Sequence, residues 1–180
     1  MQVYDNLCQL YIKKYIHLLT SITEGIVDIN TLINFYQRYI ENVPDFMNIA
    51  DKRLLNVYFS KFETITIEPA ILPNDVVAKG RPCYLKAEMN EILVRVKDGA
   101  LEYLEDGEAE VIIYVFDKSV EVLSKMKHYA LPLLNILDLQ LEDSTLILHL
   151  RGNGGHKCYE GELIPILYCL IKKLQAKILS

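Results

Sequence analysis

The sequence lacks the features of several protein classes. It has no tryptophan and four cysteines, Cys8, Cys83, Cys158 and Cys169, which lie far apart and form no CxxC pair. Such spacing suits neither a disulfide framework nor a paired zinc motif, and it is typical of reduced thiols inside a cell. The amino terminus carries no basic segment before an apolar core, so we expect no signal peptide and a cytoplasmic location.

Long apolar runs and excess positive charge are also missing. The longest uncharged stretches span about ten residues, whereas a membrane-crossing helix needs about twenty, so we expect no membrane partner. Lysine and arginine number 19 against 24 aspartate and glutamate residues, which gives a net charge of −5 and a pI near 5.4. The field of such a protein repels polyanions, which disfavours nucleic acid as a partner.

The motifs of common catalytic families are absent as well. The chain has no GxSxG elbow, no HExxH motif and no pair of acids whose spacing suggests glycoside hydrolysis. We therefore name no catalytic residue and no metal ligand. The sequence favours a non-catalytic protein without excluding an enzyme.

The chain does have an ordinary globular composition. Its 180 residues are 51% hydrophobic and 24% charged, enough for a core that needs no disulfide or metal. Over residues 1–62, apolar side chains recur at steps of three and four in three segments, separated at Gly25 and Pro44. This period predicts three amphipathic helices in a hairpin bundle or a cap, with Asp28 or Asn30 capping the second.

The period changes at Glu63, and residues 63–180 predict a mixed α/β domain. Residues 69–82 hold three prolines and a glycine, so they form a connection and offer an alternative domain boundary. The Asp98-Gly99 pair predicts a β-hairpin. A buried strand over 110–117, helical spacing over 118–137, a strand over 144–150 and a helix over 162–178 predict a βαβα unit with parallel strands. The fold class is therefore α+β, with an N-terminal helical part, a β-hairpin middle and a C-terminal βαβα unit.

The stretch RGNGGHKCYE, residues 151–160, holds the candidate ligand site. Parallel strands would bring Asp117 and this loop to one sheet edge, where α/β proteins bind ligands, and the loop would open onto the positive end of the last helix. Glycines let the backbone approach a phosphate, and basic side chains add charge. The candidate ligand-binding residues are Asp117, Arg151, Gly152, Gly154, Gly155, His156 and Lys157.

Plainer explanations of the same residues stay open. Glycines between two elements also turn the chain, and GNGG has neither the dinucleotide nor the P-loop spacing. Asp117 could cap the next helix instead of binding a ligand. His149, His156 and Cys158 are zinc-type ligands, but three local groups without a paired motif make a weak metal site.

The order of a strand ending in YVFD, a helix, and a strand leading into RGNGGHKCY resembles the archaeo-eukaryotic primase superfamily, including the polymerase domain of bacterial end-joining ligases. The resemblance covers residues 110–160. It implies that Asp117 binds a divalent metal and that His156 contacts the incoming nucleotide. Ser119 stands where the family has its second metal-binding acid, so the resemblance implies a degenerate member that binds without catalysing.

Two functions follow as hypotheses. The favoured one is a non-catalytic accessory or protein-interaction protein, with a protein partner or a homo-oligomer. The alternative is a phosphate- or nucleotide-binding module that uses the GNGGHK loop and takes a phosphate-containing small molecule. The cofactor is unknown, and it is a divalent metal if the nucleotide hypothesis holds.

Overall fold

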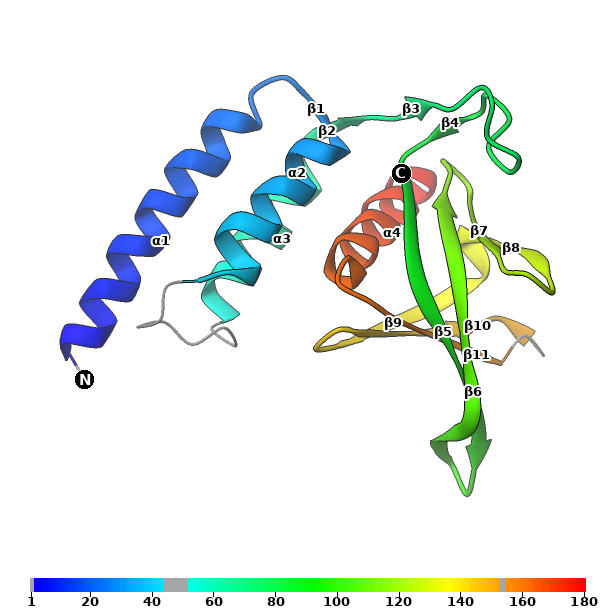
Figure 1. Ribbon diagram of the computed structural model, residues 1–180. Coiled ribbons are helices and arrows are strands. Elements are labelled where there is room, and N and C mark those ends of the chain that lie inside the picture. The colour runs from blue at the N-terminus through cyan, green and yellow to red at the C-terminus, as the bar shows by residue number, and fades with distance from the viewer. Residues whose placement is uncertain (1, 44–51, 153–154) are drawn as a thin grey trace. The chain divides into compact units, whose positions relative to one another are not determined.

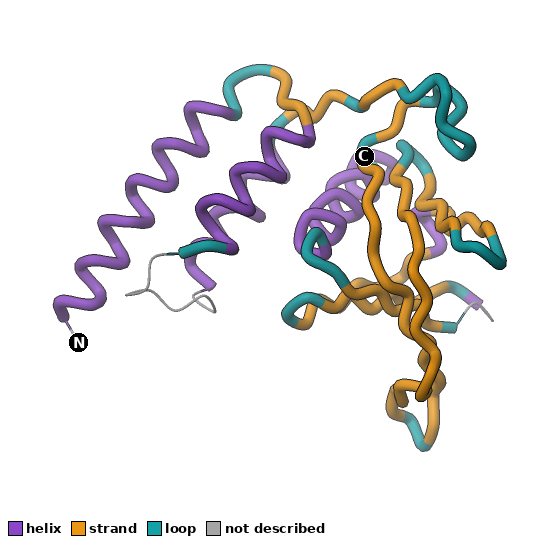
Figure 2. Tube along the Cα trace, viewed as in Figure 1, coloured by secondary structure: helices purple, strands orange, loops and turns teal. Residues whose placement is uncertain are grey.

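The computed structural model describes residues 2–43, 52–152 and 155–180 (Figures 1 and 2). The chain divides into two compact units, Met1–Glu68 and Pro69–Ser180. The first unit is mainly helical and the second is mainly strand, which confirms the α+β class with N-terminal helices. Among the described residues, no helix is long and apolar enough to cross a membrane.

Three helical segments form the first unit, as the apolar spacing predicts. They are α1 (Gln2–Ile22), α2 (Ile29–Tyr36), which continues as a π-helical turn over Gln37–Glu41, and α3 (Lys52–Thr64). Asp28 caps α2, because its side chain accepts a hydrogen bond from the backbone N–H of Asn30 at 2.6 Å. Pro44, expected to end the second helix, lies outside the described residues.

The helices of the first unit enclose its core. Two short strands, β1 (Ile26–Asp28) and β2 (Thr66–Glu68), pair in parallel beside them. The Tyr58 hydroxyl of α3 donates to the Leu32 carbonyl of α2 at 3.0 Å, which joins the two helices. The large buried side chains of this core include Tyr15, Leu19, Leu32, Leu54, Tyr58 and Phe62.

A seven-stranded antiparallel sheet dominates the second unit, in the order β8-β7-β6-β5-β11-β10-β9. The predicted hairpin joins β5 to β6, and its turn residues Asp98 and Gly99 have φ of 52° and 80°, the left-handed conformations that Asp-Gly supplies. The strands are β5 (Leu85–Lys97), β6 (Ala100–Val115), β7 (Ser119–Leu123), β8 (His128–Pro132), β9 (Ile136–Glu142), β10 (Thr145–Leu150) and β11 (His156–Glu160).

The expected βαβα unit is wrong. Residues 118–137, all of them described, contain no α-helix; they form β7, β8, the 3-10 turn η2 (Leu133–Asn135) and the start of β9. The apolar residues of this segment also fit the alternation of a strand, and Ser124 closes the turn by accepting from the N–H of Lys127 at 3.2 Å. The backbone N–H and C=O groups of β7 form hydrogen bonds with β6 and β8. The spacing of apolar residues along the chain does not indicate this pairing.

α4 (Ile164–Leu179), the predicted terminal helix, covers the inner face of the sheet. It packs against β9 and β10. Gln175 ties it to the sheet, because its Nε2 donates to the carbonyls of Leu133 and Ile136 at 2.8 and 2.9 Å. Alternate residues of the two central strands are buried on this face: Leu85, Ala87, Met89, Val111, Ile113 and Val115.

Residues 69–84 cover one end of the outer face. They contain the two-residue strands β3 (Ala70–Ile71) and β4 (Pro82–Cys83), and Val77 and Cys83 pack against Tyr114 and Phe116 of the outer face. Asp75 holds this segment in place. Its Oδ1 accepts from the N–H groups of Val77 and Ala78, each at 2.9 Å, and its Oδ2 accepts from Lys86 and Tyr114 at 2.7 and 3.1 Å.

Candidate functional site

The glycine-rich segment is the turn of a β-hairpin. It joins β10 to β11, which pair antiparallel, and the N–H of Leu150 donates to the carbonyl of Gly155 at 2.9 Å. Gly152 and Gly155 have φ of 68° and 70°, and a Cβ added at either position would meet no atom within 4 Å. These two glycines therefore serve the backbone conformation of the turn. Gly154 lies outside the described residues.

β11 separates this turn from α4. Because β11 spans His156–Glu160, the turn does not open onto the amino end of the helix, as a phosphate cradle there requires. Arg151 is exposed, and its backbone N–H donates to the carbonyl of Asn135 at 2.8 Å.

Asp117 does not join the turn. It is exposed in the connection between β6 and β7, where the next element is a strand, so it has no helix to cap. Val115 pairs with Leu85 at the start of β5, whereas Cys158 pairs with Ile92 farther along β5. The step from residue 85 to residue 92 of an extended strand is about 23 Å, so Asp117 and His156 lie toward opposite ends of the sheet.

His156 and Lys157 point to opposite faces of β11. The His156 ring meets the His149 ring edge-on at 4.4 Å between centroids, on the outer face. Lys157 lies on the inner face, with its Nζ 3.7 Å from Oε1 of Glu91. The predicted ligand residues therefore do not converge on one pocket. Across the described ranges, no group of three or more His, Cys, Asp or Glu side chains could hold a metal, and this includes the zinc set with Cys158 considered above.

If this segment is only a turn, Gly155 contributes more to the free energy of unfolding than His156 does. We expect Gly155→Ala to lower the free energy of unfolding by about 1 kcal/mol, because alanine is strained at a φ of 70°. His156→Ala is expected to change it by about 0.5 kcal/mol or less. Urea unfolding of both variants measures the difference. A melting temperature that phosphate raises in the wild type but not in His156→Ala would instead support a phosphate site at the turn.

A buried acid, Glu91, joins three strands on the inner face. Its side chain is 2% exposed, and its Oε1 accepts from the Tyr129 hydroxyl at 2.8 Å. That hydroxyl lies 2.6 Å from the hydroxyl of Tyr159. The ammonium groups of Lys127 and Lys157 lie 3.4 and 3.7 Å from the carboxylate. Since β8 and β11 are separated by three strands in the sheet order, these contacts require the sheet to curl.

Burial favours the neutral forms of three groups in this unit, namely Tyr129, Tyr159 and Cys158. Burial raises the pKa of Tyr129 and of Tyr159, and at Tyr129 the nearby Tyr159 and Glu91 add to the effect. Burial also raises the pKa of the Cys158 thiol to about 11, with a further contribution from the carboxylates of Glu160 and Glu142. A thiol with that pKa is not a nucleophile near neutral pH, and the tyrosine hydroxyls act as hydrogen-bond donors.

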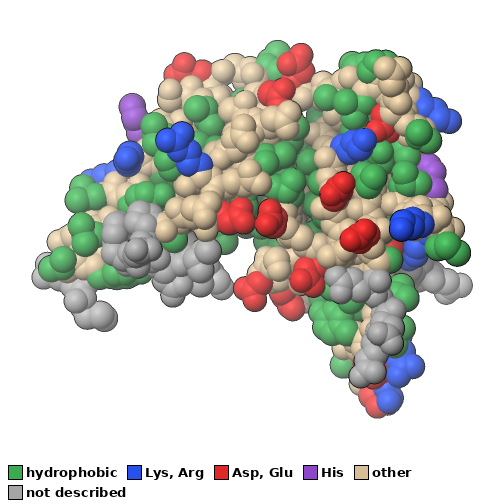
Figure 3. All heavy atoms as spheres, viewed as in Figure 1, with side chains coloured by type: hydrophobic (Ala, Val, Ile, Leu, Met, Phe, Trp, Pro, Cys, Tyr) green, Lys and Arg blue, Asp and Glu red, His purple; other side chains and the backbone are tan. Residues whose placement is uncertain are grey.

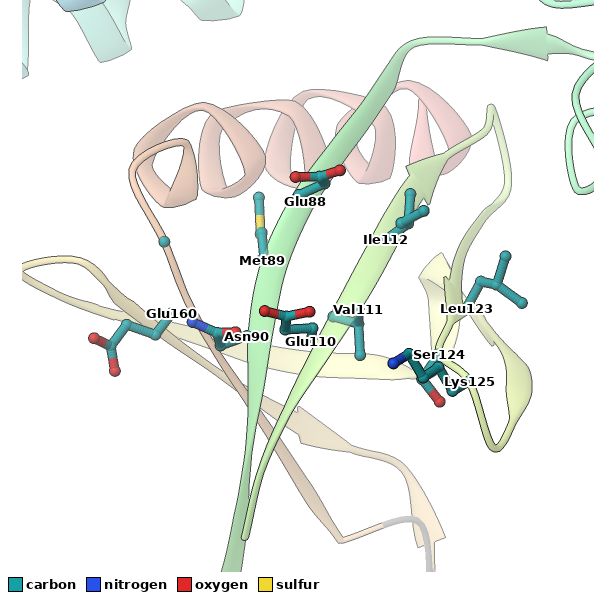
Figure 4. A pocket seen from close by; sticks show the side chains of 11 residues that line it. Glu88, Met89, Asn90, Glu110, Val111, Ile112, Leu123, Ser124, Lys125 and Glu160 are labelled. Carbon is teal, nitrogen blue, oxygen red and sulfur yellow. The ribbon is translucent and has the colours of Figure 1, made fainter. Parts of the chain in front are cut away.

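The part of the outer face that residues 69–84 leave open forms a groove of about 600 Å³ (Figure 4). Cross-strand pairing places its side chains in two rows, and residues paired in this way point to the same face. The first row contains Leu123 of β7, Ile112 of β6 and Glu88 of β5, and the second contains Glu110 of β6, Asn90 of β5 and Glu160 of β11.

The groove has a hydrophobic part and an acidic part, and the exposed Lys125, just past β7, also lines it. Ile112 and Leu123 are half-buried, whereas Glu88, Glu110 and Glu160 are exposed. None of these three carboxylates has an ion-pair or hydrogen-bond partner within the described part of the chain. Glu88 and Glu110 lie at the two central strands in Figure 4, with Glu160 to one side. The space-filling view shows acidic and hydrophobic side chains next to each other on the visible face of this unit (Figure 3).

The sequence alone did not predict this groove. The alternation of Lys86, Glu88 and Asn90 with buried residues does predict that one face of β5 is exposed. The pairing register, however, decides that Glu110 and Glu160 lie beside Asn90, and these residues come from strands far apart in the chain. No local pattern indicates that register.

Comparisons with known proteins do not identify a family. No protein-family model matches the sequence. No curated protein matches it either. Among solved structures, the chain is similar to the C-terminal domain of an unknown protein from Leishmania infantum, with 10% identity and a TM-score of 0.33, over 49% of this chain and 82% of that one.

Proposed function

We propose that this protein is a non-catalytic protein-interaction protein and that a segment of its partner binds in the groove on the outer face of the sheet. The observation that supports this proposal is the groove itself. Half-buried Ile112 and Leu123 lie beside exposed polar groups in a concave surface at the centre of the sheet. Proteins usually bind their ligands at concave surfaces that combine apolar area with a few polar groups.

The chemistry of the second unit supports binding over catalysis. The buried thiol of Cys158 and the hydroxyl of Tyr129 are neutral groups, and Asp117 and His156 are far apart. The phosphate- or nucleotide-binding alternative needs Asp117 to lie beside the GNGGHK loop, whereas the strand register puts Asp117 and His156 toward opposite ends of the sheet. The primase resemblance stays a prediction, and the helix in its strand-helix-strand order is replaced by β7 and β8.

A steric block of the groove tests the proposal. We expect Asn90→Trp to weaken the binding of partner segments about tenfold or more, because the indole fills the centre of the groove without changing the net charge. The matched control is Gln140→Trp, which puts the same side chain on an exposed position of β9 outside the groove. Random peptides displayed on phage are selected on the wild-type protein, and the affinities of the enriched peptides for all three proteins are then measured.

Peptides that bind the wild type and Gln140→Trp equally well, but bind Asn90→Trp at least tenfold more weakly, would support the groove as the binding surface. Equal binding to all three proteins would contradict it. Failure to enrich any peptide above an unrelated control protein would contradict it as well.

A further inference from the structure

We propose that the groove binds a basic segment, in which lysine or arginine side chains lie next to a hydrophobic residue. This inference rests on the proposed function, because it names the chemistry of the partner for the same groove. Three observations carry it: the spacing of the acids, their lack of partners among the described residues, and the apolar side chains beside them.

Two of the acids are close enough to repel each other. Glu88 pairs with Ile112 and Asn90 pairs with Glu110, so the two carboxylates belong to diagonal neighbours on adjacent strands. Diagonal neighbours lie about 7–8 Å apart, within the reach of long side chains, and two like charges at that separation repel each other weakly in water. A cationic group placed between Glu88 and Glu110 would interact with both carboxylates and relieve this repulsion.

The acidic row continues across the sheet beyond this pair. Glu160 lies two strands from Glu110, which is about 10 Å, and Thr145 of β10 pairs with both Glu160 and Glu142. The pKa of Tyr103 responds to these acids as well. Burial raises that pKa most, Cys158 raises it further, and the carboxylates of Glu142 and Glu160 add to the rise. A partner with more than one basic side chain would therefore meet several acids in succession, against which Lys125 is the one basic residue in the groove's lining.

The arrangement favours a basic protein segment over other cationic or charged ligands. The acids are too dispersed for one ion, since no group of described His, Cys, Asp and Glu residues could hold a metal. The net charge of −5 disfavours nucleic acids and other polyanions. Ile112 and Leu123 give the groove a hydrophobic part that a purely polar cation would leave unused.

Charge neutralisation in the groove tests this inference. The probe is a short fluorescein-labelled peptide that repeats Lys-Leu-Ser, compared with one that repeats Glu-Leu-Ser, and binding is followed by fluorescence anisotropy. We expect the basic peptide to bind the wild type and the acidic peptide not to bind. The double variant Glu88→Gln, Glu110→Gln is expected to bind the basic peptide about tenfold more weakly, and added salt should weaken binding to the wild type.

The matched control changes the net charge equally, away from the groove. Glu24→Gln with Glu68→Gln removes two exposed acids from the first unit, and this variant should bind the basic peptide as tightly as the wild type. An equal loss in both double variants would mean that the peptide responds to net charge alone, which would overturn the inference. Displacement of the peptide by spermidine at concentrations matched in charge would overturn it too, because it would assign the groove to small polycations.

The two proposals can fail separately. If Asn90→Trp blocks the selected peptides but these carry no excess of lysine or arginine, the groove binds partners and the basic specificity is wrong. If Asn90→Trp and Gln140→Trp bind both the selected peptides and the Lys-Leu-Ser probe equally, the groove is not the binding surface and both proposals fall.

Discussion

Replacing Glu91 with alanine is expected to lower the free energy of unfolding by about 3 kcal/mol. The Tyr129 hydroxyl loses an acceptor at 2.8 Å, and the ammonium groups of Lys127 and Lys157 lose the carboxylate that balances their charge. The two lysine side chains are 43% and 28% exposed, so water compensates them in part. The expected loss therefore lies at the lower end of the range for a broken buried ion pair.

Urea unfolding at neutral pH measures this loss. Glu88→Ala is the control, because it removes an exposed acid from the same strand and should change stability by about 0.5 kcal/mol or less. Combining Glu91→Ala with Tyr129→Phe should cost less than the sum of the two single changes, since both remove the same hydrogen bond. A loss no larger than that of Glu88→Ala would show that the network contributes nothing to stability.

Replacing Asp75 with alanine is expected to lower the free energy of unfolding by about 2–3 kcal/mol at neutral pH. The carboxylate accepts from the N–H groups of Val77 and Ala78, which position the segment that packs on Tyr114 and Phe116. The ion pair with Lys86 adds less, because that lysine side chain is 44% exposed. The hydrogen bond from Lys86, followed by that from the Ala78 N–H, holds the pKa of Asp75 well below its ordinary value.

The lowered pKa sets the pH dependence of this loss. A carboxyl group whose pKa is lower in the folded protein stabilises the fold above its ordinary pKa of about 4, and this contribution disappears as the pH falls further toward the folded pKa. The difference between wild type and Asp75→Ala should thus be constant from neutral pH to about pH 5 and then shrink. Asp138→Ala, an exposed acid on β9, is the control and should show little difference. A difference that grows in acid would contradict this assignment.

The first unit and the hairpin could be predicted because their signals are local. The steps of three and four in α1 and α2 reflect a helix's own period, and Asp28 caps its helix through a neighbour two residues away. The Asp98-Gly99 turn needs two adjacent residues that accept positive φ. Each feature depends on residues that are close in sequence.

The prediction of a helix over 118–137 was wrong because the structure of this segment depends on residues distant in the sequence. Val120, Val122 and Leu131 fit both a helical stripe and an alternating strand, so local spacing gives no decision. The backbone of β7 is satisfied by β6 and β8, and once these strands pair, the parallel arrangement that would have joined Asp117 to His156 no longer exists. The predicted site depended on that arrangement.

By itself, the sequence determined where helices, turns and buried strands form in much of this chain, because periodicity, caps and turn residues act over a few positions. The tertiary structure decided which surfaces these elements share. Glu91 meets Tyr129 and Tyr159 because the sheet curls, and Glu88, Glu110 and Glu160 share a groove because three strands pair in one register. Both outcomes depend on contacts between residues distant in the chain. These contacts form, and stabilise the protein, only when the whole sheet is assembled.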